Sequence, residues 1–289
     1  MVTSHLGGEQ PRRSGVSALV LTRNETDQIA GCLASLAWAD EIFVVDSYST
    51  DGTPELIRGQ FPHVRLEQHE YFGAGAQRNF ALDRLAHDWV FVLDADERVT
   101  AEARDEILAI LERPKHWAWE IRRKNFILDC EAKYGGLQRD WVTRLFHRGH
   151  ARYQNRRVHA EVDVDGEIGR MKGTLLHYYV RSLDHMAEKM TRYAVWGAAN
   201  QFREGRRGPF WKILLRPAWR FTRDYVAWRG FLDGMPGIVV AGLHVFYTFF
   251  KYAKLWEFSM QERLGVPVTL PAFDADAARW AKPWETRQS

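Results

Sequence analysis

The sequence predicts an α/β protein whose mainly parallel sheet is flanked by helices. From Val16 onward, short β-rich runs alternate with amphipathic helical patterns, as expected for βαβ units. Several of the β-rich runs are almost continuously apolar, which is typical of strands covered on both faces. The chain has 289 residues, 46% of them hydrophobic, so it can form one large domain with appendages or two modest domains.

Four strands are predicted within the first hundred residues, at 16–22, 41–45, 63–68 and 89–93. Ile29, Leu33 and Leu36 recur at helical spacing after the first strand. Thr53 and Pro54 form a helix start, with a capping side chain followed by proline at the first helical position. Residues 77–85 are expected to form another helix, and Thr100 is expected to cap one that follows the fourth strand.

The alternation weakens beyond Arg113. Residues 158–172 have the pattern of a hairpin with Asp165 and Gly166 at its turn. Residues 182–202 are expected to form a helix, and 206–257 a separate module rich in Trp, Phe and Arg. The apolar run 238–250 is shorter than the roughly 20 residues needed to cross a bilayer. We therefore expect it to lie on a membrane rather than to span one.

The composition excludes several classes of protein. The formal net charge is only +3, which argues against a dedicated nucleic-acid-binding protein, although residues 203–230 hold eight cations against two acids. The two cysteines, Cys32 and Cys130, are far apart, which excludes a disulfide framework and a structural zinc site and favours a reducing compartment. No apolar stretch near Met1 resembles a secretory signal.

Polar clusters directly follow three of the predicted strands, at residues 22–25, 46–52 and 94–97. In an open α/β sheet, ligands bind at the carboxyl ends of the strands, so we expect these clusters to converge on one edge. Each cluster taken alone also has a simpler explanation. Asn24 could cap a helix, and Asp46 and Asp51 could shape a turn.

An Asp-x-Asp pattern occurs three times, at Asp94/Asp96, Asp163/Asp165 and Asp274/Asp276. Only the first ends a buried strand, where adjacent carboxylates are costly unless a cation or hydroxyl group binds them. Oxygen ligands of this kind suit Mg²⁺ or Mn²⁺ carrying a substrate diphosphate. Such an ion would stabilise negative charge on the leaving group.

Four motifs in order carry a family resemblance: Leu-Thr-Arg-Asn-Glu, Val-Val-Asp-Ser-Tyr-Ser-Thr-Asp-Gly-Thr, Gly-Ala-Gly-Ala-Gln-Arg-Asn-Phe-Ala-Leu and Leu-Asp-Ala-Asp-Glu-Arg. Together they resemble the family 2 inverting glycosyltransferases of GT-A fold, and within that family the bacterial lipopolysaccharide core β1,4-glucosyltransferases. The resemblance runs from about residue 16 to 177. It continues less specifically through 206–257, in Arg-Gly-Phe-Leu-Asp-Gly and Tyr-Ala-Lys-Leu-Trp-Glu.

The resemblance implies a UDP-sugar donor and a set of residues that bind it. Asp46 would accept a hydrogen bond from the uracil imide, Asp94 would hold the ribose or metal, and Asp96 would bind the Mg²⁺ or Mn²⁺ that bridges the diphosphate. Arg23 takes the place of an aromatic residue common in the wider family. The full nucleotide-sugar set is Thr22, Arg23, Asn24, Glu25, Asp46, Asp51, Arg78 and Asp94.

Inversion at the anomeric carbon needs a base that takes the proton of the acceptor hydroxyl. Asp140 matches the family's Asp followed by Arg-Leu-Phe, and Glu161 is the second candidate. In Val-His-Ala-Glu, however, this acid lies one residue beyond its usual place, which reverses its face on a strand. The simpler explanations are a salt bridge from Asp140 to Arg144 and an ordinary packed His159.

The basic aromatic segment also has competing interpretations. Its aromatic residues interleave with Arg216, Arg220 and Arg223, as in a helix lying in an anionic membrane surface. The alternatives are a helical subdomain packed on the core and a dimer interface. RNA binding is disfavoured because no recognised RNA-binding pattern accompanies the charge.

We therefore divide the chain into a disordered N-terminus (1–14), a GT-A glycosyltransferase domain (15–202), a helical module associated with the membrane surface (203–262) and an extended tail (263–289). The expected protein is cytoplasmic and attached to the inner face of the bacterial cytoplasmic membrane. It would move a hexose, glucose by the resemblance, from a UDP-sugar to a lipid-linked saccharide acceptor in lipopolysaccharide core or other cell-envelope glycan synthesis.

Two alternatives from other classes remain. A nucleotidyltransferase could use the same sheet and paired acids, but the N-terminal region lacks a Gly-rich phosphate loop followed by Lys. A catalytically silent surface-binding protein could keep the fold for packing alone. The sequence does not specify an oligomeric state.

Overall fold

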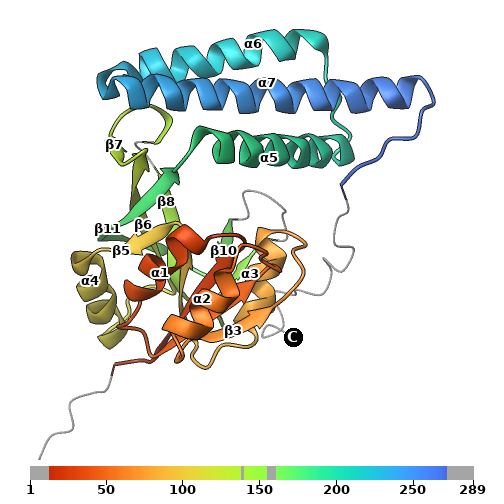
Figure 1. Cartoon of the computed structure of the whole chain (residues 1–289). Coiled ribbons are helices and arrows are strands. Elements are labelled where there is room, and N and C mark those ends of the chain that lie inside the picture. Colours follow the sequence, from red (N-terminus) through yellow and green to blue (C-terminus); the bar gives the residue numbers. More distant parts are fainter. Residues whose placement is uncertain (1–12, 138–139, 155–160, 272–289) are drawn as a thin grey trace, which may run out of the picture.

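The computed structural model describes residues 13–137, 140–154 and 161–271. A β-sheet with helices packed on it forms one part, and three long helices lie together beyond one end of the sheet (Figure 1). His159 and the Asp274/Asp276 pair lie outside the described residues, as do most of the N-terminus and most of the tail.

The main sheet has nine strands in the order β3-β2-β1-β4-β8-β6-β11-β5, with β7 paired to β6, while β9 and β10 form a separate pair. The strands are β1 (Val16–Thr22), β2 (Glu41–Asp46), β3 (Arg65–Gln68), β4 (Trp89–Asp94), β5 (Glu97–Val99), β6 (Ala118–Ile127), β7 (Cys130–Ala132), β8 (Trp141–His147), β9 (Ala151–Tyr153), β10 (Val162–Val164) and β11 (Ile168–Val180). Strands β3, β2, β1 and β4 run parallel, as predicted. Strands β8, β5 and β7 pair antiparallel, so the whole sheet is mixed.

The α-helices are α1 (Thr26–Ala34), α2 (Thr53–Gln60), α3 (Ala74–Leu82), α4 (Ala101–Glu112), α5 (Leu183–Arg203), α6 (Phe210–Phe221) and α7 (Met235–Arg263). Short helical turns lie at Gly135–Leu137, Thr222–Ala227 and Gly230–Asp233. The predicted cap at Thr100 is present, because its hydroxyl accepts from the Ala103 N–H. The predicted cap at Thr53 is wrong: α2 begins at Thr53 itself, its N-cap is Gly52 without a side-chain cap, and Pro54 lies in the first turn. Helix α3 begins three residues before the predicted 77, because Gly75 and Ala76 are small, buried residues that give no apolar periodicity.

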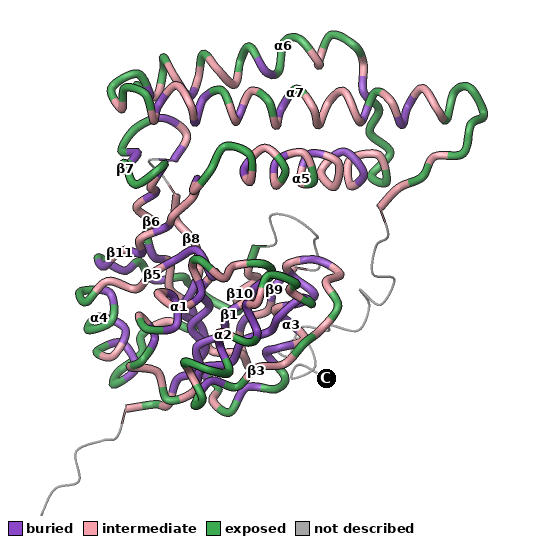
Figure 2. Tube along the Cα trace, viewed as in Figure 1, coloured by how far each residue is buried: buried purple, intermediate pink, exposed green. Residues whose placement is uncertain are grey.

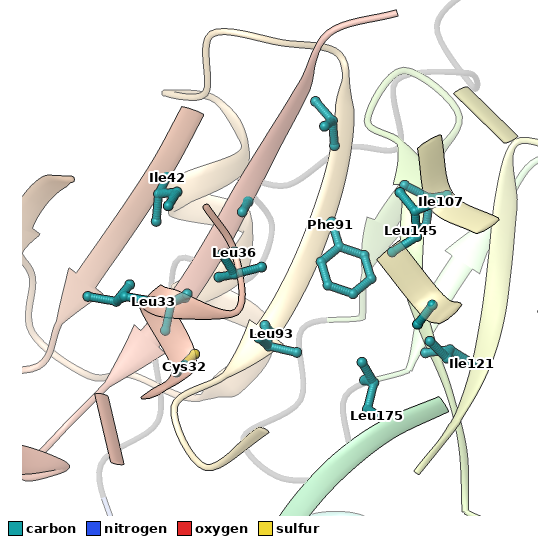
Figure 3. Close-up of a cluster of buried hydrophobic side chains, with 14 of the residues drawn as sticks. Cys32, Leu33, Leu36, Ile42, Phe91, Leu93, Ile107, Ile121, Leu145 and Leu175 are labelled. Carbon is teal, nitrogen blue, oxygen red and sulfur yellow. The ribbon is translucent and has the colours of Figure 1, made fainter. Parts of the chain in front are cut away.

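Two apolar clusters cover the sheet on its opposite faces, which explains the continuous apolar runs. Val16, Ala18 and Val20 of β1 belong to one cluster, while Leu19 belongs to the other. In the first cluster Phe91 lies between Leu36 on one side and Leu145 with Ile107 on the other (Figure 3). All four side chains are fully buried. This core fixes the positions at which the parallel strands end.

The predicted hairpin at 158–172 is wrong. A turn does lie at Asp165 and Gly166, but β10 before it pairs with β9, and β11 after it pairs with β6 and β5. Strand β11 buries every second residue, including Met171 and Leu175, along its first ten positions. This long apolar face can be buried only inside the main sheet, so β11 pairs with β6 rather than with β10, the strand that precedes it in the sequence.

Helices α5, α6 and α7 form a layer in which α7 lies between the other two (Figure 1). The start of α6 and the end of α7 line one pocket, so these two helices run antiparallel. Helix α7 has 29 residues, more than the predicted apolar run, and by length and composition it could cross a membrane. Only 28% of its most apolar window is buried, and much of the outer surface of α6 is exposed (Figure 2).

Candidate active site

The carboxyl ends of three parallel strands meet at one edge of the sheet, as predicted. In the register of the sheet, Thr22 of β1 lies opposite Asp46 of β2, and Leu21 lies opposite Asp94 of β4. Thr22 is buried, and its hydroxyl oxygen has no hydrogen-bond partner within the described residues. A buried polar atom without a partner is costly, so this edge has a place for a ligand that can hydrogen-bond.

The loops that follow β1 and β2 are joined by side-chain hydrogen bonds. Asn24 has a φ of 56°, its N–H donates to Ser49 Oγ (2.8 Å), and its Oδ1 accepts from the Thr50 N–H (2.8 Å). Burial alone would raise the pKa of Asp51, but hydrogen bonds from Thr26 and Thr53 outweigh it and lower that pKa to about 2. Asn24 and Asp51 therefore hold the two loops together.

Asp46 is fully buried beneath these loops. Its carboxylate accepts hydrogen bonds from the Ser49 N–H (3.0 Å), from the Ser49 hydroxyl and from Gln68 Nε2 (2.9 Å). A carboxylate can accept about four hydrogen bonds, so Asp46 keeps little free capacity. The hydrogen bonds of Asp46 explain the turn at 46–52, because they connect that turn to β3.

Asp94 is held between two arginines. Arg78 Nη2 lies 2.6 Å from Oδ1, and Arg144 Nη2 lies 2.5 Å from Oδ2. Burial would raise the pKa of Asp94, but the two guanidinium groups hold it well below its usual range. Arg144 also contacts Glu97 Oε1 at 2.6 Å, and Arg123 contacts the same oxygen at 3.0 Å. Both oxygens of Asp94 are therefore occupied by protein cations.

Asp96 is buried but has looser partners. Its Oδ2 lies 3.5 Å from Lys189 Nζ and 3.6 Å from His177 Nε2, both beyond ordinary hydrogen-bond length. Burial would raise the pKa of Asp96, but Lys189 and His177 hold it well below the usual range. Lys189 comes from α5, so the three-helix layer contributes directly to this edge of the sheet.

Asp140 lies at the start of β8, in the same network. Arg123 binds its carboxylate through two nitrogens, at 2.9 and 2.7 Å, and Asn125 Nδ2 donates to Oδ2 at 3.1 Å. Burial would raise the pKa of Asp140, but Arg123 and Asn125 lower it. The alternative partner considered from the sequence, Arg144, is wrong. Along a strand, four residues span about 13 Å, which no salt bridge can bridge.

Glu25 also faces Asp96. Arg181 Nη2 lies 2.7 Å from its carboxylate, yet burial together with the negative charge of Asp96 raises the pKa of Glu25 to about 7. Of the remaining predicted residues, Arg23 is exposed after β1 and Glu161 is exposed just after the undescribed residues 155–160. The Glu161 carbonyl accepts from the Gln154 N–H (2.8 Å), which places this residue beside β9.

Comparison with known proteins decides the family. The pattern described as "Glycosyl transferase family 2" matches residues 17–163, just over half of the chain. The chain belongs to glycosyltransferase family 2. The predicted resemblance is thus confirmed, the fold is of the GT-A type, and the protein is a glycosyltransferase.

Two curated relatives and one solved structure illustrate the similarity. The lipopolysaccharide core biosynthesis glycosyltransferase LpsC of Rhizobium meliloti (strain 1021) is 29% identical over 255 residues, covering 84% of this chain and 92% of LpsC. An uncharacterized glycosyltransferase of Rickettsia prowazekii (strain Madrid E) is 25% identical over 261 residues, covering 86% and 89% of the two chains. The mannosyltransferase PcManGT of Pyrobaculum calidifontis, in complex with GDP-Man and Mn²⁺, superimposes with a TM-score of 0.48 at 17% identity, covering 88% and 90%.

The side chains around Asp96 fit a divalent cation in this glycosyltransferase. Asn125 uses its amide N–H groups toward Leu137 O and Asp140, so its Oδ1 accepts from His177 Nδ1–H at 2.6 Å. This network assigns a proton to Nδ1, so Nε2 is the ring nitrogen that faces Asp96 Oδ2, 3.6 Å away, and it offers a lone pair to a cation when it carries no proton of its own. Two ligands that each lie about 2.1 Å from one cation have a separation in this range.

No group of three or more His, Cys, Asp or Glu side chains in the described ranges is arranged to hold a metal ion. Mg²⁺ and Mn²⁺ are commonly held by one or two carboxylates together with substrate phosphates, so Asp96 alone is sufficient in number, and His177 would add a nitrogen ligand that Mn²⁺ accepts more readily than Mg²⁺. Asp94 is a poor ligand because Arg78 and Arg144 occupy its oxygens.

Sequence reasoning missed the residues that come from the later strands and α5. These are Arg123, Asn125, Arg144, His177 and Lys189. None directly follows one of the predicted parallel strands, and only Arg144 lies in a quoted motif, the Arg-Leu-Phe after Asp140, where it was given the wrong partner. Their only local signal is a polar side chain at a buried position, such as Asn125, His177 and Arg144 among otherwise apolar neighbours.

Proposed function

We propose that this glycosyltransferase moves a hexose from a UDP-sugar to a lipid-linked saccharide in lipopolysaccharide core synthesis, with inversion at the anomeric carbon. The similarity to LpsC over 84% of the chain supports the pathway. The main support for the enzymatic part of the proposal is that Thr22, Asp46, Asp94 and Asp96 lie together at one edge of the sheet. The proposal includes a cytoplasmic location at the inner face of the bacterial cytoplasmic membrane.

In this proposal the two loops after β1 and β2 bind the nucleoside. The unpaired hydroxyl of Thr22 supplies a hydrogen bond, and exposed Arg23 would cover the base. Asp46 would accept from the uracil imide with the acceptor position that Ser49 and Gln68 leave free. Asn24 and Asp51 fix the loops, and Arg78 and Asp94 form the side toward the ribose and diphosphate. Glu25 completes the set beside Asp96.

A Mg²⁺ or Mn²⁺ ion held by Asp96 and His177 would, when bound, neutralise the charge that develops on the departing diphosphate. The chain itself supplies the base. Asp140 is kept ionised by Arg123 and Asn125, so it can accept the proton of an acceptor hydroxyl, and Glu161 is the alternative. Variants Asp140→Asn and Glu161→Gln distinguish the two: the base variant loses transfer while UDP binding is retained.

The α6 and α7 surface supports attachment to a membrane. Large apolar side chains are exposed along both helices: Phe210, Trp211, Leu214, Leu215, Trp219, Met235, Phe246, Phe249 and Trp256. Contiguous exposed apolar surface of this kind marks an interaction site. Exposed Arg216 and Arg229 lie among them and suit anionic headgroups. Arg220 and Arg223 are instead only partly exposed, and both donate to buried Asp224, at 2.7 and 2.8 Å.

Peripheral attachment fits better than a membrane span. Helix α7 packs along α5, which carries Asp184, Glu188, Lys189 and Arg192. Placing α7 across a bilayer would bring these charges into hydrocarbon, at a cost of several kcal/mol (about 2.5–3.5 for each charge near the centre). An orientation with the outer face of α6 and α7 on the surface leaves the α5 charges in water.

The direct test is transfer from radiolabelled UDP-sugars to a lipid-linked acceptor with Mn²⁺ present. Transfer or donor hydrolysis supports the proposal. Release of pyrophosphate from a nucleoside triphosphate would indicate a nucleotidyltransferase instead, and inertness toward all donors would indicate a silent binding protein. Asp96→Asn is expected to abolish transfer while the thermal unfolding temperature changes little. Wild-type turnover in Asp96→Asn would remove the metal role of this residue.

A further inference from the structure

We propose that Lys189 is the resident counter-ion of Asp96, holding the place of the divalent cation until metal and nucleotide bind together. The inference rests on the proposed function and adds a residue from α5 to it. The first observation is the position of the Lys189 amine. Lys189 Nζ lies 3.5 Å from Asp96 Oδ2, the same oxygen that faces His177 Nε2 at 3.6 Å.

The charges around this position are balanced. Four carboxylates, Asp94, Asp96, Glu97 and Asp140, form ion pairs with four cations, Arg78, Arg123, Arg144 and Lys189. The neighbouring Glu25 is paired with Arg181, which adds one charge of each sign. The side chains of Asp96, Glu97 and Arg144 are at most 11% exposed, so the network is poorly screened by water. A divalent cation entering alone would therefore add uncompensated positive charge beside Lys189.

Metal and nucleotide entering together avoid this cost. A divalent cation and the diphosphate of a sugar nucleotide carry about equal and opposite charge, so the pair leaves the network balanced. Lys189 is suited to the exchange because a lysine is a point charge on a flexible stem. Its distance to Asp96 is longer than a hydrogen bond, whereas the arginine contacts to Asp94 and Glu97 are 2.5–3.0 Å.

Lys189 thus has opposite effects on the binding of the two ligands. It repels the cation when the nucleotide is absent, and it attracts the diphosphate when the cation is absent. The cation therefore binds favourably only when the diphosphate is also present, because the diphosphate offsets the repulsion from Lys189. The amine is also left beside the diphosphate when the sugar departs, where a positive charge favours the leaving group.

The test compares Lys189→Met with wild type in two binding measurements on the full-length protein. Free Mn²⁺, followed by electron paramagnetic resonance without nucleotide, is expected to bind Lys189→Met about tenfold more tightly than wild type. UDP, measured by calorimetry in EDTA, is expected to bind Lys189→Met about tenfold more weakly. Equal affinities of the two proteins for both ligands would overturn the proposal.

Three further variants test whether the change in affinity arises from the charge of Lys189 beside Asp96. Lys189→Arg keeps the charge and is expected to bind Mn²⁺ alone as wild type does. Arg192→Met removes a cation from the same helix that pairs with Glu188 rather than Asp96, and is expected to change neither affinity. Adding Asp96→Asn to Lys189→Met is expected to abolish the gain in Mn²⁺ binding, and a persisting gain would place the cation elsewhere and overturn the proposal.

The outcomes separate this proposal from the proposed function. If wild type binds UDP tightly with Mn²⁺ and transfers sugar, but Lys189→Met is unchanged, only the role of Lys189 fails. If wild type binds no uridine nucleotide under any condition, the proposed function fails first. Unfolding of the variant cannot produce the expected result. Loss of structure would weaken the binding of both ligands, whereas removal of the counter-ion is expected to strengthen the binding of Mn²⁺ and weaken the binding of UDP.

Discussion

Glu25 connects the charge of the site to the stability of the protein. Its pKa rises from 4.5 to about 7, so between these values the folded protein binds a proton that the unfolded chain has released. The contribution of Glu25 to the free energy of unfolding is therefore most favourable below pH 4.5, and it decreases as the pH rises to about 7. We expect Glu25→Gln to gain stability relative to wild type between pH 5 and pH 8, on the order of 2–3 kcal/mol.

Thermal or urea unfolding of both proteins at pH 5 and pH 8 measures this difference. Glu55→Gln is the matched control, because the Glu55 side chain is 73% exposed and should give the same small difference at both pH values. A Glu25→Gln difference that does not change with pH would mean that the carboxylate is well solvated in the folded state.

The sequence predicted individual site residues only where a local rule applied. Thr22, Asp46 and Asp94 could be placed together because parallel strands end at a common edge. The partners of Asp94 and Asp140 could not, because Arg144, Arg123 and Asn125 reach them through antiparallel pairing of β8 and β6. That pairing depends on long-range packing, so Arg144 binds Asp94 and Glu97 rather than Asp140, its neighbour in sequence.

Among the elements, the turn Gly135–Leu137 links the active site to the helical layer. The Asp233 carboxylate accepts from the N–H groups of Lys133 (3.1 Å) and Tyr134 (2.8 Å). Gly136 packs so closely that an added Cβ would lie 2.8 Å from Asp224 Oδ2. At the end of the turn, Leu137 O accepts from Asn125, which also binds Asp140. The helical layer therefore supports the position of the candidate base.

We expect Asp233→Ala to lower kcat about ten- to hundredfold while the KM for the UDP-sugar changes little, because the turn contacts Asn125, which binds Asp140, rather than the nucleoside residues. Asp105→Ala, which removes an exposed carboxylate beside Arg104, is the control. Steady-state kinetics with both substrates varied measures the effect. A rise in donor KM with unchanged kcat would show that the loop serves nucleotide binding instead.

Elements with strong local signals were predicted well, and those that depend on partners were not. The parallel strands follow from apolar runs, α5 was predicted within a residue of its ends, and the start of α4 follows from its capping residue Thr100. The hairpin at 158–172 failed because a turn signal does not say which strand becomes the neighbour. The length of α7 was missed because its helix continues through polar residues after Phe250.

On the scale of the whole molecule, attachment to a membrane can be tested through the apolar face of α6. Leu214, Leu215 and Trp219 are 67%, 61% and 61% exposed. Replacing all three with Ser is expected to release the protein from vesicles containing anionic lipid, since each buried side chain contributes about 1.5–3 kcal/mol. Sedimentation with vesicles measures the bound fraction.

The matched control replaces Trp117 and Ile168 with Ser, because these side chains are 41% and 40% exposed but lie at the strand portion of the molecule. Their loss should leave vesicle binding unchanged. Retained binding of the triple α6 variant would argue that this face packs against protein rather than lipid, as in the dimer or subdomain alternatives.

The stacking of α5 beneath α7 has a consequence for which acceptors can be used. Packed helices are spaced by about 8–10 Å, and Lys189 reaches Asp96 from the inner helix of the stack. If the outer face rests on lipid as proposed, the reacting sugar must stand at least one helix diameter above the bilayer. The helices would then act as a spacer: a glycolipid acceptor with too short a stem would not reach Asp96, and the length of the acceptor glycan would determine when it can be used.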